Sequence, residues 1–161
     1  MGKPLSRQDW LWLAPFAIAV AAVMAVGGAI TAPAIGEWYD GLNRPPWTPP
    51  NWVFAPVWAL LYAMMAVAAW LVWRRRRSMP VGLPIAVWAL QLALNLGWSV
   101  AFFGLRNPML GLIDIAVLLL AILASFALFW PTSRLAWWLL APYILWVGYA
   151  AALNYAIWRL N

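Results

Sequence analysis

Charged residues divide this chain into five long stretches that carry almost no charge. The stretches cover residues 10–36, 45–73, 78–105, 107–133 and 135–158. Charged residues such as Arg74–Arg77 lie between the stretches, and Asp114 is the one charged residue inside them. About 20 apolar residues suffice for a helix to span a bilayer. Only 9% of the 161 residues are charged, against about 25% in an ordinary soluble domain. The pattern predicts an all-α integral membrane protein, a bundle of five transmembrane helices.

The connections between these stretches are short, so little of the chain is left for a soluble part. We expect residues 1–161 to form a single membrane domain. The helices are predicted at about 10–31, 51–73, 82–103, 108–130 and 135–160. Pro33 is expected to end the first helix, and Pro108 to open the fourth. The short alternating segments typical of an outer-membrane barrel are not visible.

The segment between the first two helices is unusual for a loop. Residues 37–58 read EWYDGLNRPPWTPPNWVFAPVW, which we call the aromatic segment. Its prolines, Pro45, Pro46, Pro49 and Pro50, stiffen the backbone and exclude a regular helix or a central strand there. Bare tryptophan rings in a mobile, solvated loop would cost free energy. We therefore expect an ordered lid between helices 1 and 2 that folds over an apolar, aromatic surface.

Several classes of chemistry are excluded by what the sequence lacks. It contains no Cys and no His, which removes disulfides, thiolate and imidazole metal sites, and the commonest general base. No nucleophile–base pair and no phosphate-binding loop is present, so a hydrolase or a nucleotide-driven pump is not expected. We predict no metal site. The redox-capable side chains that remain are Trp and Tyr.

Basic residues are unequally divided between the two sides of the predicted bundle. Lys3, Arg7, Arg74–Arg77 and Arg134 lie on one side, and Arg44, Arg106 and Arg159 on the other. Such an excess marks the cytoplasmic side of a membrane protein. We expect a bacterial inner membrane, a cytoplasmic N-terminus and the aromatic segment outside. The net charge of +6 thus reports orientation rather than nucleic-acid binding. Residues 74–77 are interpreted as a topology anchor, with a lipid or partner site as the alternative.

The third predicted helix carries two different stripes. Small residues recur every four positions at Ala89, Ala93, Gly97 and Ala101, whereas Gln91, Asn95 and Trp98 form a polar, aromatic stripe. The two stripes are offset by two residues, or about 200° around a helix. In one interpretation both stripes only pack helices within a monomer. In the other, the small stripe forms a homodimer and the polar stripe faces a ligand. A stripe of alanines in the first helix, at positions 17, 21, 25 and 29, is the rival dimer surface.

Aromatic pairs one helical turn apart are candidates for the walls of a pocket. Trp58 and Tyr62 form such a pair in the second helix, and Trp146 and Tyr149 in the fifth, where Ala150 lies on the same face. Tryptophan at membrane depth is often a filler or an anchor, and both interpretations stay open here. Asp114 is a functional candidate as the acid inside a span, although a structural contact with a neighbouring helix is favoured.

Three motifs in order resemble one known family. They are WYDGLNRPPWTPPNWVFAPVWALLY, QLALNLGWSVAFFG and APYILWVGYAAALN. The chain resembles, from about residue 10 to residue 161, the TspO family. Its members are called tryptophan-rich sensory proteins in bacteria, and translocator protein or peripheral benzodiazepine receptor in mitochondria. The resemblance implies a five-helix bundle, usually a homodimer, with a pocket closed by the first loop. Its implied ligands are porphyrins such as protoporphyrin IX, sterols and benzodiazepine-type drugs.

The resemblance also implies which positions contact the ligand. These are Trp38, Tyr39, Trp58, Asn95, Trp98, Trp146 and Ala150, to which the helix faces add Tyr62, Gln91 and Tyr149. Leu153, Tyr155 and Arg159 match the loose sterol-recognition pattern of the fifth helix, although a bacterial membrane offers little cholesterol. Residues 74–77 match nothing that the family assigns.

Three functions are consistent with these observations. The leading hypothesis is a membrane receptor or sensor that binds a tetrapyrrole as a ligand, not as a cofactor, with Arg44, Asn95 or Gln91 meeting its polar groups. The second is light- and oxygen-dependent breakdown of the bound porphyrin, with Trp58 and Trp146 as the redox-active residues. The third is transport of porphyrin or lipid, which the absence of internal repeats disfavours. Whether the protein is an enzyme stays open at this point.

Overall fold

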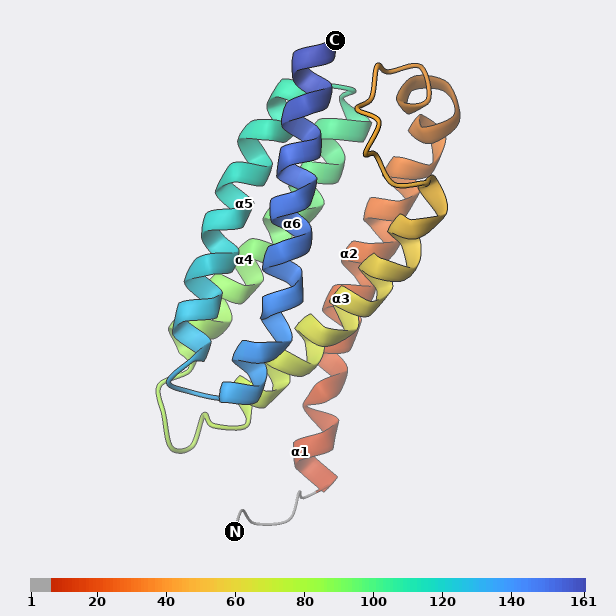
Figure 1. The fold of residues 1–161 in the computed structure, drawn as a ribbon. Coiled ribbons are helices and arrows are strands. Elements are labelled where there is room, and N and C mark those ends of the chain that lie inside the picture. Colours follow the sequence, from red (N-terminus) through yellow and green to blue (C-terminus); the bar gives the residue numbers. More distant parts are fainter. Residues whose placement is uncertain (1–6) are drawn as a thin grey trace.

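The predicted five-helix membrane bundle is confirmed. The computed structural model describes residues 7–161, and within that range it consists of helices and their connections (Figure 1). Its elements are α1 (Arg7–Leu11), α2 (Leu13–Ala34), the π-helical turn η1 (Ile35–Tyr39), α3 (Asn51–Trp73), α4 (Gly82–Ser99), the π-helical turn η2 (Val100–Gly104), α5 (Pro108–Phe129) and α6 (Arg134–Leu160). Five helical stretches in this range are long and apolar enough to cross a membrane.

The first helix is longer than predicted. Pro33 was expected to end it, but α2 continues through Pro33 to Ala34 and runs on as η1. A proline lacks the N–H that an α-helix needs, but it removes only the one bond back to residue 29, and membrane helices tolerate this loss. Beyond the proline the helix widens, because the N–H of Asp40 donates to the carbonyl of Ile35, five residues back, at 3.1 Å. The irregular connection is therefore shorter than the aromatic segment and covers residues 40–50, which we call loop 40–50.

The third span has a similar wide turn at the same end of the molecule. In η2 the N–H of Leu105 donates to the carbonyl of Val100 at 2.8 Å, again five residues back. Arg106 then reverses the chain with a φ of 52°. Asn107 caps the next helix, because its Oδ1 accepts from the N–H of Leu110 at 3.0 Å, and Pro108 opens α5 as predicted.

The five spans pack in two groups that share α4 and α6. Helix α5 contacts α4 and α6, whereas α2 contacts α3 and α4, and α3 contacts α6. The main core lies between them and includes Met65, Trp88, Ile122 and Tyr143. A smaller cluster around Phe102 and Tyr39 lies beside loop 40–50, at the same end as the C-terminus (Figure 1). The N-terminal side of the bundle lies at the opposite end.

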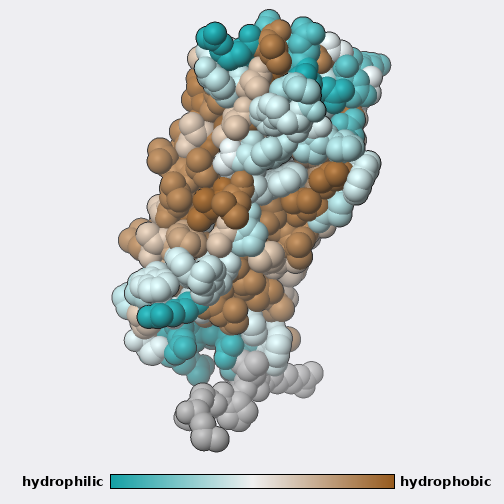
Figure 2. Space-filling model, in the orientation of Figure 1, coloured by the Kyte–Doolittle hydropathy of each residue, from teal (hydrophilic) through white to brown (hydrophobic). Residues whose placement is uncertain are grey.

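The surface and the ends of the bundle suit a bilayer. Figure 2 shows apolar residues gathered in the middle of the visible face, with hydrophilic residues at both ends. At the end opposite loop 40–50, arginines lie over indole rings. The Arg74 guanidinium carbon is 4.9 Å from the Trp70 ring centre, and that of Arg134 is 4.4 Å from Trp130. Such cation–π stacks hold charges at the level of interfacial aromatic rings.

Candidate functional site

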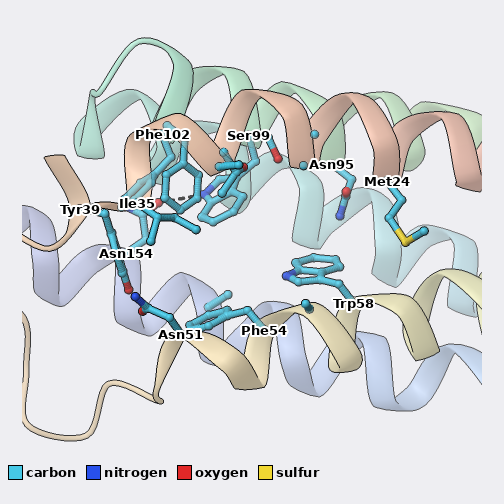
Figure 3. Close-up of a pocket in the computed structure, with 18 of the residues that line it drawn as sticks. Met24, Ile35, Tyr39, Asn51, Phe54, Trp58, Asn95, Ser99, Phe102 and Asn154 are labelled. Atoms are coloured by element: carbon cyan, nitrogen blue, oxygen red, sulfur yellow. Dashed lines mark hydrogen bonds between the residues drawn. The ribbon is translucent and has the colours of Figure 1, made fainter. Parts of the chain in front are cut away.

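A cavity of about 350 Å³ lies in the half of the bundle next to loop 40–50 (Figure 3). Four of the five spans line it, and α5 contributes no residue. Its lining comprises Met24, Gly27, Gly28, Thr31 and Ala32 from α2, Ile35 and Tyr39 from η1, Asn51, Phe54, Ala55, Trp58 and Tyr62 from α3, Asn95, Trp98 and Ser99 from α4, Phe102 and Phe103 from η2, and Trp146, Ala150, Leu153, Asn154 and Ile157 from α6. None of these described lining residues is charged.

Aromatic rings make up much of the cavity wall and brace one another. The Trp58 ring lies 5.6 Å from that of Tyr62, and the Trp98 ring stacks at 5.3 Å on Phe102. Trp146 packs against Phe54 with 5.8 Å between ring centres. Its Nε1–H is buried and has no hydrogen-bond partner among residues 7–161. The walls thus offer flat apolar faces and an unused indole donor, and a flat ring system is the ligand shape that they favour.

A chain of hydrogen bonds runs from the cavity wall into the core. The Tyr62 hydroxyl donates to Oδ1 of Asn95, and Nδ2 of Asn95 donates to the Tyr143 hydroxyl at 3.1 Å. Tyr143 donates in turn to Oε1 of Gln91 at 2.9 Å, and Nε2 of Gln91 donates to the sulfur of Met65 at 3.6 Å. We call these five residues the tyrosine cluster. All five are buried, as polar groups in a membrane interior must be.

A second polar group lies closer to loop 40–50. Oδ1 of Asn154 accepts from Nε1 of Trp98 at 3.0 Å, while Nδ2 of Asn154 donates to the carbonyl of Pro108 at 2.7 Å. We call these three residues the Asn154 cluster. Asn154 is only 2% exposed. It joins α6 to α4 and to the first residue of α5, and so holds together the spans behind the cavity.

Loop 40–50 is bound to the bundle by hydrogen bonds at two places. The side chain of Asn161 bonds reciprocally to the backbone of Asn43, through Oδ1 at 3.0 Å and Nδ2 at 3.1 Å. Further along, the Tyr149 hydroxyl donates to the carbonyl of Trp47 at 2.8 Å, and the two rings lie 5.6 Å apart. The expected ordered connection is therefore present. Tyr39 and Asn51, at its two ends, face the cavity (Figure 3).

The structure brings seven of the ten predicted ligand-binding residues to the cavity. These are Tyr39, Trp58, Tyr62, Asn95, Trp98, Trp146 and Ala150. They come from η1, α3, α4 and α6. The helix faces predicted six of them from the sequence, whereas Tyr39 was implied by the family resemblance alone. Whether they bind a ligand stays a prediction.

The other three predicted residues lie behind the wall. Trp38 packs edge-on against Phe102, with 5.4 Å between ring centres. Gln91 is 1% exposed and belongs to the tyrosine cluster, while Tyr149 holds loop 40–50. Arg44 also stays outside, where its guanidinium carbon is 4.8 Å from the Tyr39 ring centre and Nη2 is 3.4 Å from Oδ1 of Asp40. Gln91 and Arg44 therefore do not line the cavity in this structure, and contact of either with a ligand stays a prediction.

The residues of the sterol-like pattern do not share one environment. Leu153 is buried in the cavity wall, whereas Tyr155 is 50% exposed and Arg159 is also exposed. One helical turn separates Tyr155 from Arg159, so these two lie on the outer face of α6. The pattern is therefore divided between the inside and the outside of the bundle.

The predicted dimer stripe is divided as well. Ala89 and Ala93 are exposed, but Ala101 is buried within the monomer. Gly97 lies against α5, because a Cβ added there would come within 2.8 Å of Oδ1 of Asp114. Asp114 thus packs against the small stripe, away from the cavity, and its Oδ2 has no hydrogen-bond partner among the described residues. The homodimer stays a prediction, with only the Ala89–Ala93 end of the stripe free for it.

Sequence reasoning missed two contributions to this site. Five residues of α2 line the cavity, although the role predicted for that helix was only the rival dimer surface. The adjacent Gly27 and Gly28, followed by Thr31, were the available signal in an otherwise alanine-rich run. Tyr143 was also missed, although it is fully buried and links Asn95 to Gln91. A tyrosine midway along an apolar span requires a hydrogen-bond partner, and that requirement was the signal.

The fold and the cavity define a multi-pass all-α membrane protein with an internal aromatic pocket next to its first loop. Residues 16–159 match the TspO/MBR family, and the chain belongs to that family. It is 39% identical to Protein CrtK of Rhodobacter capsulatus, covering 91% of this chain and 92% of the relative. It is 41% identical to the translocator protein of Sus scrofa (78% and 75%) and 37% identical to the tryptophan-rich sensory protein of Cereibacter sphaeroides (96% and 94%).

Proposed function

We propose that this protein is a membrane receptor or sensor that binds protoporphyrin-type tetrapyrroles in the aromatic cavity. The observation that carries the proposal is an uncharged cavity walled by Trp58, Trp98 and Trp146 within the membrane-spanning helices. Flat apolar rings gain most from stacking against such walls. Relatives named as a sensory protein and as a translocator protein support a role in binding rather than a purely structural one.

The polar groups around the cavity suit the edges of such a ligand. The unused Nε1–H of Trp146 is a donor for a ring nitrogen or carbonyl. Carboxylate side arms need a cation, and Arg44 lies beside Tyr39 of the cavity wall. Its ion pair with Asp40 is partly exposed and weak, so a carboxylate competes for Arg44 at little cost. A volume of about 350 Å³ is at the small end for ligand pockets. We therefore expect a full tetrapyrrole to require movement of loop 40–50.

Porphyrin photodegradation is the second candidate, favoured by the position of two tryptophans. Trp58 and Trp146 both line the cavity, and each has a tyrosine ring nearby, Tyr62 at 5.6 Å and Tyr149 at 5.9 Å. Under light, the excited porphyrin gives an electron to oxygen, and the oxidised ring would then be within reach of an electron from either indole, with the neighbouring tyrosine as the next donor. No acid–base side chain is needed for that step.

Titration of purified protein with protoporphyrin IX in the dark tests the receptor proposal. Trp58→Ala and Tyr39→Ala should each weaken binding about 5- to 150-fold, the effect of losing about 1–3 kcal/mol of aromatic contact. Trp52→Ala is the matched control, because Trp52 is on the same helix, is 75% exposed and does not line the cavity. Equal losses in all three variants would contradict a site in this cavity.

Illumination of the same complexes in air tests the second candidate. Trp58→Phe and Trp146→Phe keep the apolar bulk but are much harder to oxidise, so binding should persist while porphyrin loss slows. Free porphyrin in detergent and an oxygen-free sample are the controls. If both variants consume porphyrin at the parental rate, the tryptophans are a binding wall only. An intact ligand recovered from every sample favours the receptor.

We also propose a cytoplasmic N-terminus in a bacterial inner membrane, with loop 40–50 on the outer side. The basic residues 74–77 and Arg134 lie at one end of the bundle, and Arg44 and Arg106 at the other. Lys3 strengthens the same count, although it lies outside the described residues. Labelling of single cysteines introduced at Ser78 and at Asn43 in intact cells checks the orientation, with only the second accessible from outside.

A further inference from the structure

The tyrosine cluster determines which kind of hydrogen-bonding group the cavity wall presents. Tyr62 and Asn95 both line the cavity and are bonded to each other. A tyrosine hydroxyl has a single proton. If Tyr62 donates that proton to Asn95, only its oxygen lone pairs remain for a ligand. If Tyr62 instead accepted a hydrogen bond from Asn95, its O–H would be free to donate to a ligand. The direction of the bonds in the cluster therefore decides what the wall recognises.

That direction is set at the far end of the cluster, by Met65. A thioether sulfur accepts hydrogen bonds weakly and never donates. The amide nitrogen of Gln91 therefore faces the Met65 sulfur at 3.6 Å, and its Oε1 faces Tyr143. With the amide reversed, Oε1 would meet the sulfur lone pairs and no hydrogen bond would form there. Met65 itself is completely buried in α3, so no water competes for Gln91.

Each following bond is then determined by the one before it. Oε1 of Gln91 only accepts, so Tyr143 donates its single proton to it. Tyr143 must in turn accept from Asn95, which directs Nδ2 towards Tyr143 and Oδ1 towards Tyr62. Because Oδ1 only accepts, Tyr62 donates to it. All the bonds point from the cavity to the core, and the Tyr62 oxygen keeps unused lone pairs.

We propose that Tyr62, held in this direction by the tyrosine cluster, is a hydrogen-bond acceptor that makes the cavity selective for flat aromatic ligands carrying an N–H or O–H donor. This inference rests on the proposed role of the cavity as a ligand site. Pyrroles, indoles and phenols fit the description, whereas aromatic ethers of the same outline do not. In an apolar site a ligand acceptor placed against the Tyr62 oxygen leaves both groups unpaired, which costs more than a missing bond alone.

Three tricyclic probes of nearly equal shape separate the possibilities. Carbazole carries one N–H donor, dibenzofuran carries an acceptor oxygen, and fluorene carries neither. Equilibrium dialysis against the detergent-solubilised protein, corrected for partition into empty micelles, gives their relative affinities. The parental protein should prefer carbazole over dibenzofuran about tenfold, the effect of one net hydrogen bond. Fluorene should fall between them or match dibenzofuran.

Two variants test how the preference arises. Tyr62→Phe removes the acceptor and should reduce the ratio to about one. Met65→Leu keeps the volume but removes the sulfur, so Gln91 can turn and both bond directions become populated; the ratio should fall severalfold although residue 65 is not in the cavity wall. Met64→Leu, at the neighbouring position outside the tyrosine cluster, is the matched control and should leave the ratio unchanged. Thermal unfolding in detergent verifies that each variant is folded.

The outcomes distinguish this inference from the receptor proposal. Equal parental affinities for carbazole and dibenzofuran, a preference that survives Tyr62→Phe, or no binding of any tricycle would overturn it. If protoporphyrin IX binds but the tricycles are not discriminated, only this inference fails. If the tricycles are discriminated but protoporphyrin IX does not bind, only the tetrapyrrole proposal fails. A ratio that is unaffected by Met65→Leu would remove Met65 as the determinant of direction.

Discussion

The two polar clusters of the interior are built on opposite principles. The Asn154 cluster ends on groups whose roles cannot change, because an indole N–H only donates and a backbone carbonyl only accepts. The tyrosine cluster consists of side chains alone, two hydroxyls and two amides that can each bond in either direction. It depends on the weak bond from Gln91 to Met65 for its order. The bond directions of the Asn154 cluster are fixed by a backbone carbonyl, whereas those of the tyrosine cluster are only favoured by one weak bond.

This difference assigns the clusters different tasks. The Asn154 cluster connects three spans next to the π-helical turn η2, so we expect it to contribute mainly to stability. The tyrosine cluster connects α3, α4 and α6 beneath the cavity wall, where a change of bond direction alters recognition with little change in packing. A membrane interior tolerates both, because every bond replaces contacts that lipid cannot offer.

The largest expected effect is in the Asn154 cluster. Asn154→Leu keeps a similar volume but leaves the Nε1–H of Trp98 without its partner and removes one of the bonds to the carbonyl of Pro108, the first residue of α5. The unsatisfied donor costs about 1–3 kcal/mol and the other lost bond about 1 kcal/mol, so the free energy of unfolding should fall by about 2–4 kcal/mol. Thermal unfolding in detergent measures the change. Tyr155→Leu, one residue further and 50% exposed, is the control, and an equal loss in both would remove the Asn154 cluster as a stabilising group.

A methyl group at Gly111 tests how closely the same cluster is packed. A Cβ there would lie 3.0 Å from Oδ1 of Asn154 and 3.0 Å from two carbon atoms of Phe102. Gly111→Ala should therefore destabilise the protein by about 1–3 kcal/mol through overpacking. Gly148→Ala, on α6, meets nothing within 4 Å and should be neutral or slightly stabilising. If the two alanine variants unfold alike, the contact at Gly111 is not tight.

The smallest effect on stability is expected in the tyrosine cluster. Tyr143→Phe removes the central hydroxyl and leaves Nδ2 of Asn95 and Oε1 of Gln91 free to find each other or Tyr62 by rotation. Because these side chains can rearrange, we expect a loss of about 1–2 kcal/mol, less than for Asn154→Leu. Tyr155→Phe, on the outer face, should cost almost nothing. A larger loss for Tyr143→Phe than for Asn154→Leu would reverse the assignment of tasks to the two clusters.

Much of this architecture follows from the sequence, because a bilayer allows few alternatives. Long charge-free runs force helices, and the second helix was predicted at its observed bounds, Asn51–Trp73. The polar stripe of α4 also predicted which face points inward, since Asn95 and Trp98 have no other favourable place. These inferences need only the apolar interior of the bilayer and the period of the α-helix.

Other features depend on contacts that no helical period reveals. The helix continues through Pro33 into the widened turn η1, which the packing of Trp38 and Tyr39 against Phe102 and Phe103 stabilises. Gln91 shares a face with Asn95, yet it lies behind the cavity because Tyr143 of α6 stands between them. The small stripe of α4 did not predict that Gly97 packs against Asp114, because this contact joins two different spans.

The two π-helical turns have a consequence for insertions and deletions. A π turn contains about one residue more than an α turn, so it is the form that a single-residue insertion takes inside a helix. Removing one residue from 35–39 would restore the regular repeat and leave the residues beyond the turn in nearly the same phase, because the wide turn absorbs the extra residue. Removing one residue from the regular part of α2 would instead rotate everything beyond it by about 100°, and Trp38 and Tyr39 would turn away from Phe102 and Phe103. The wide turn is thus the place at this end of the bundle where the chain length can change by one residue while the side chains around the cavity keep their directions.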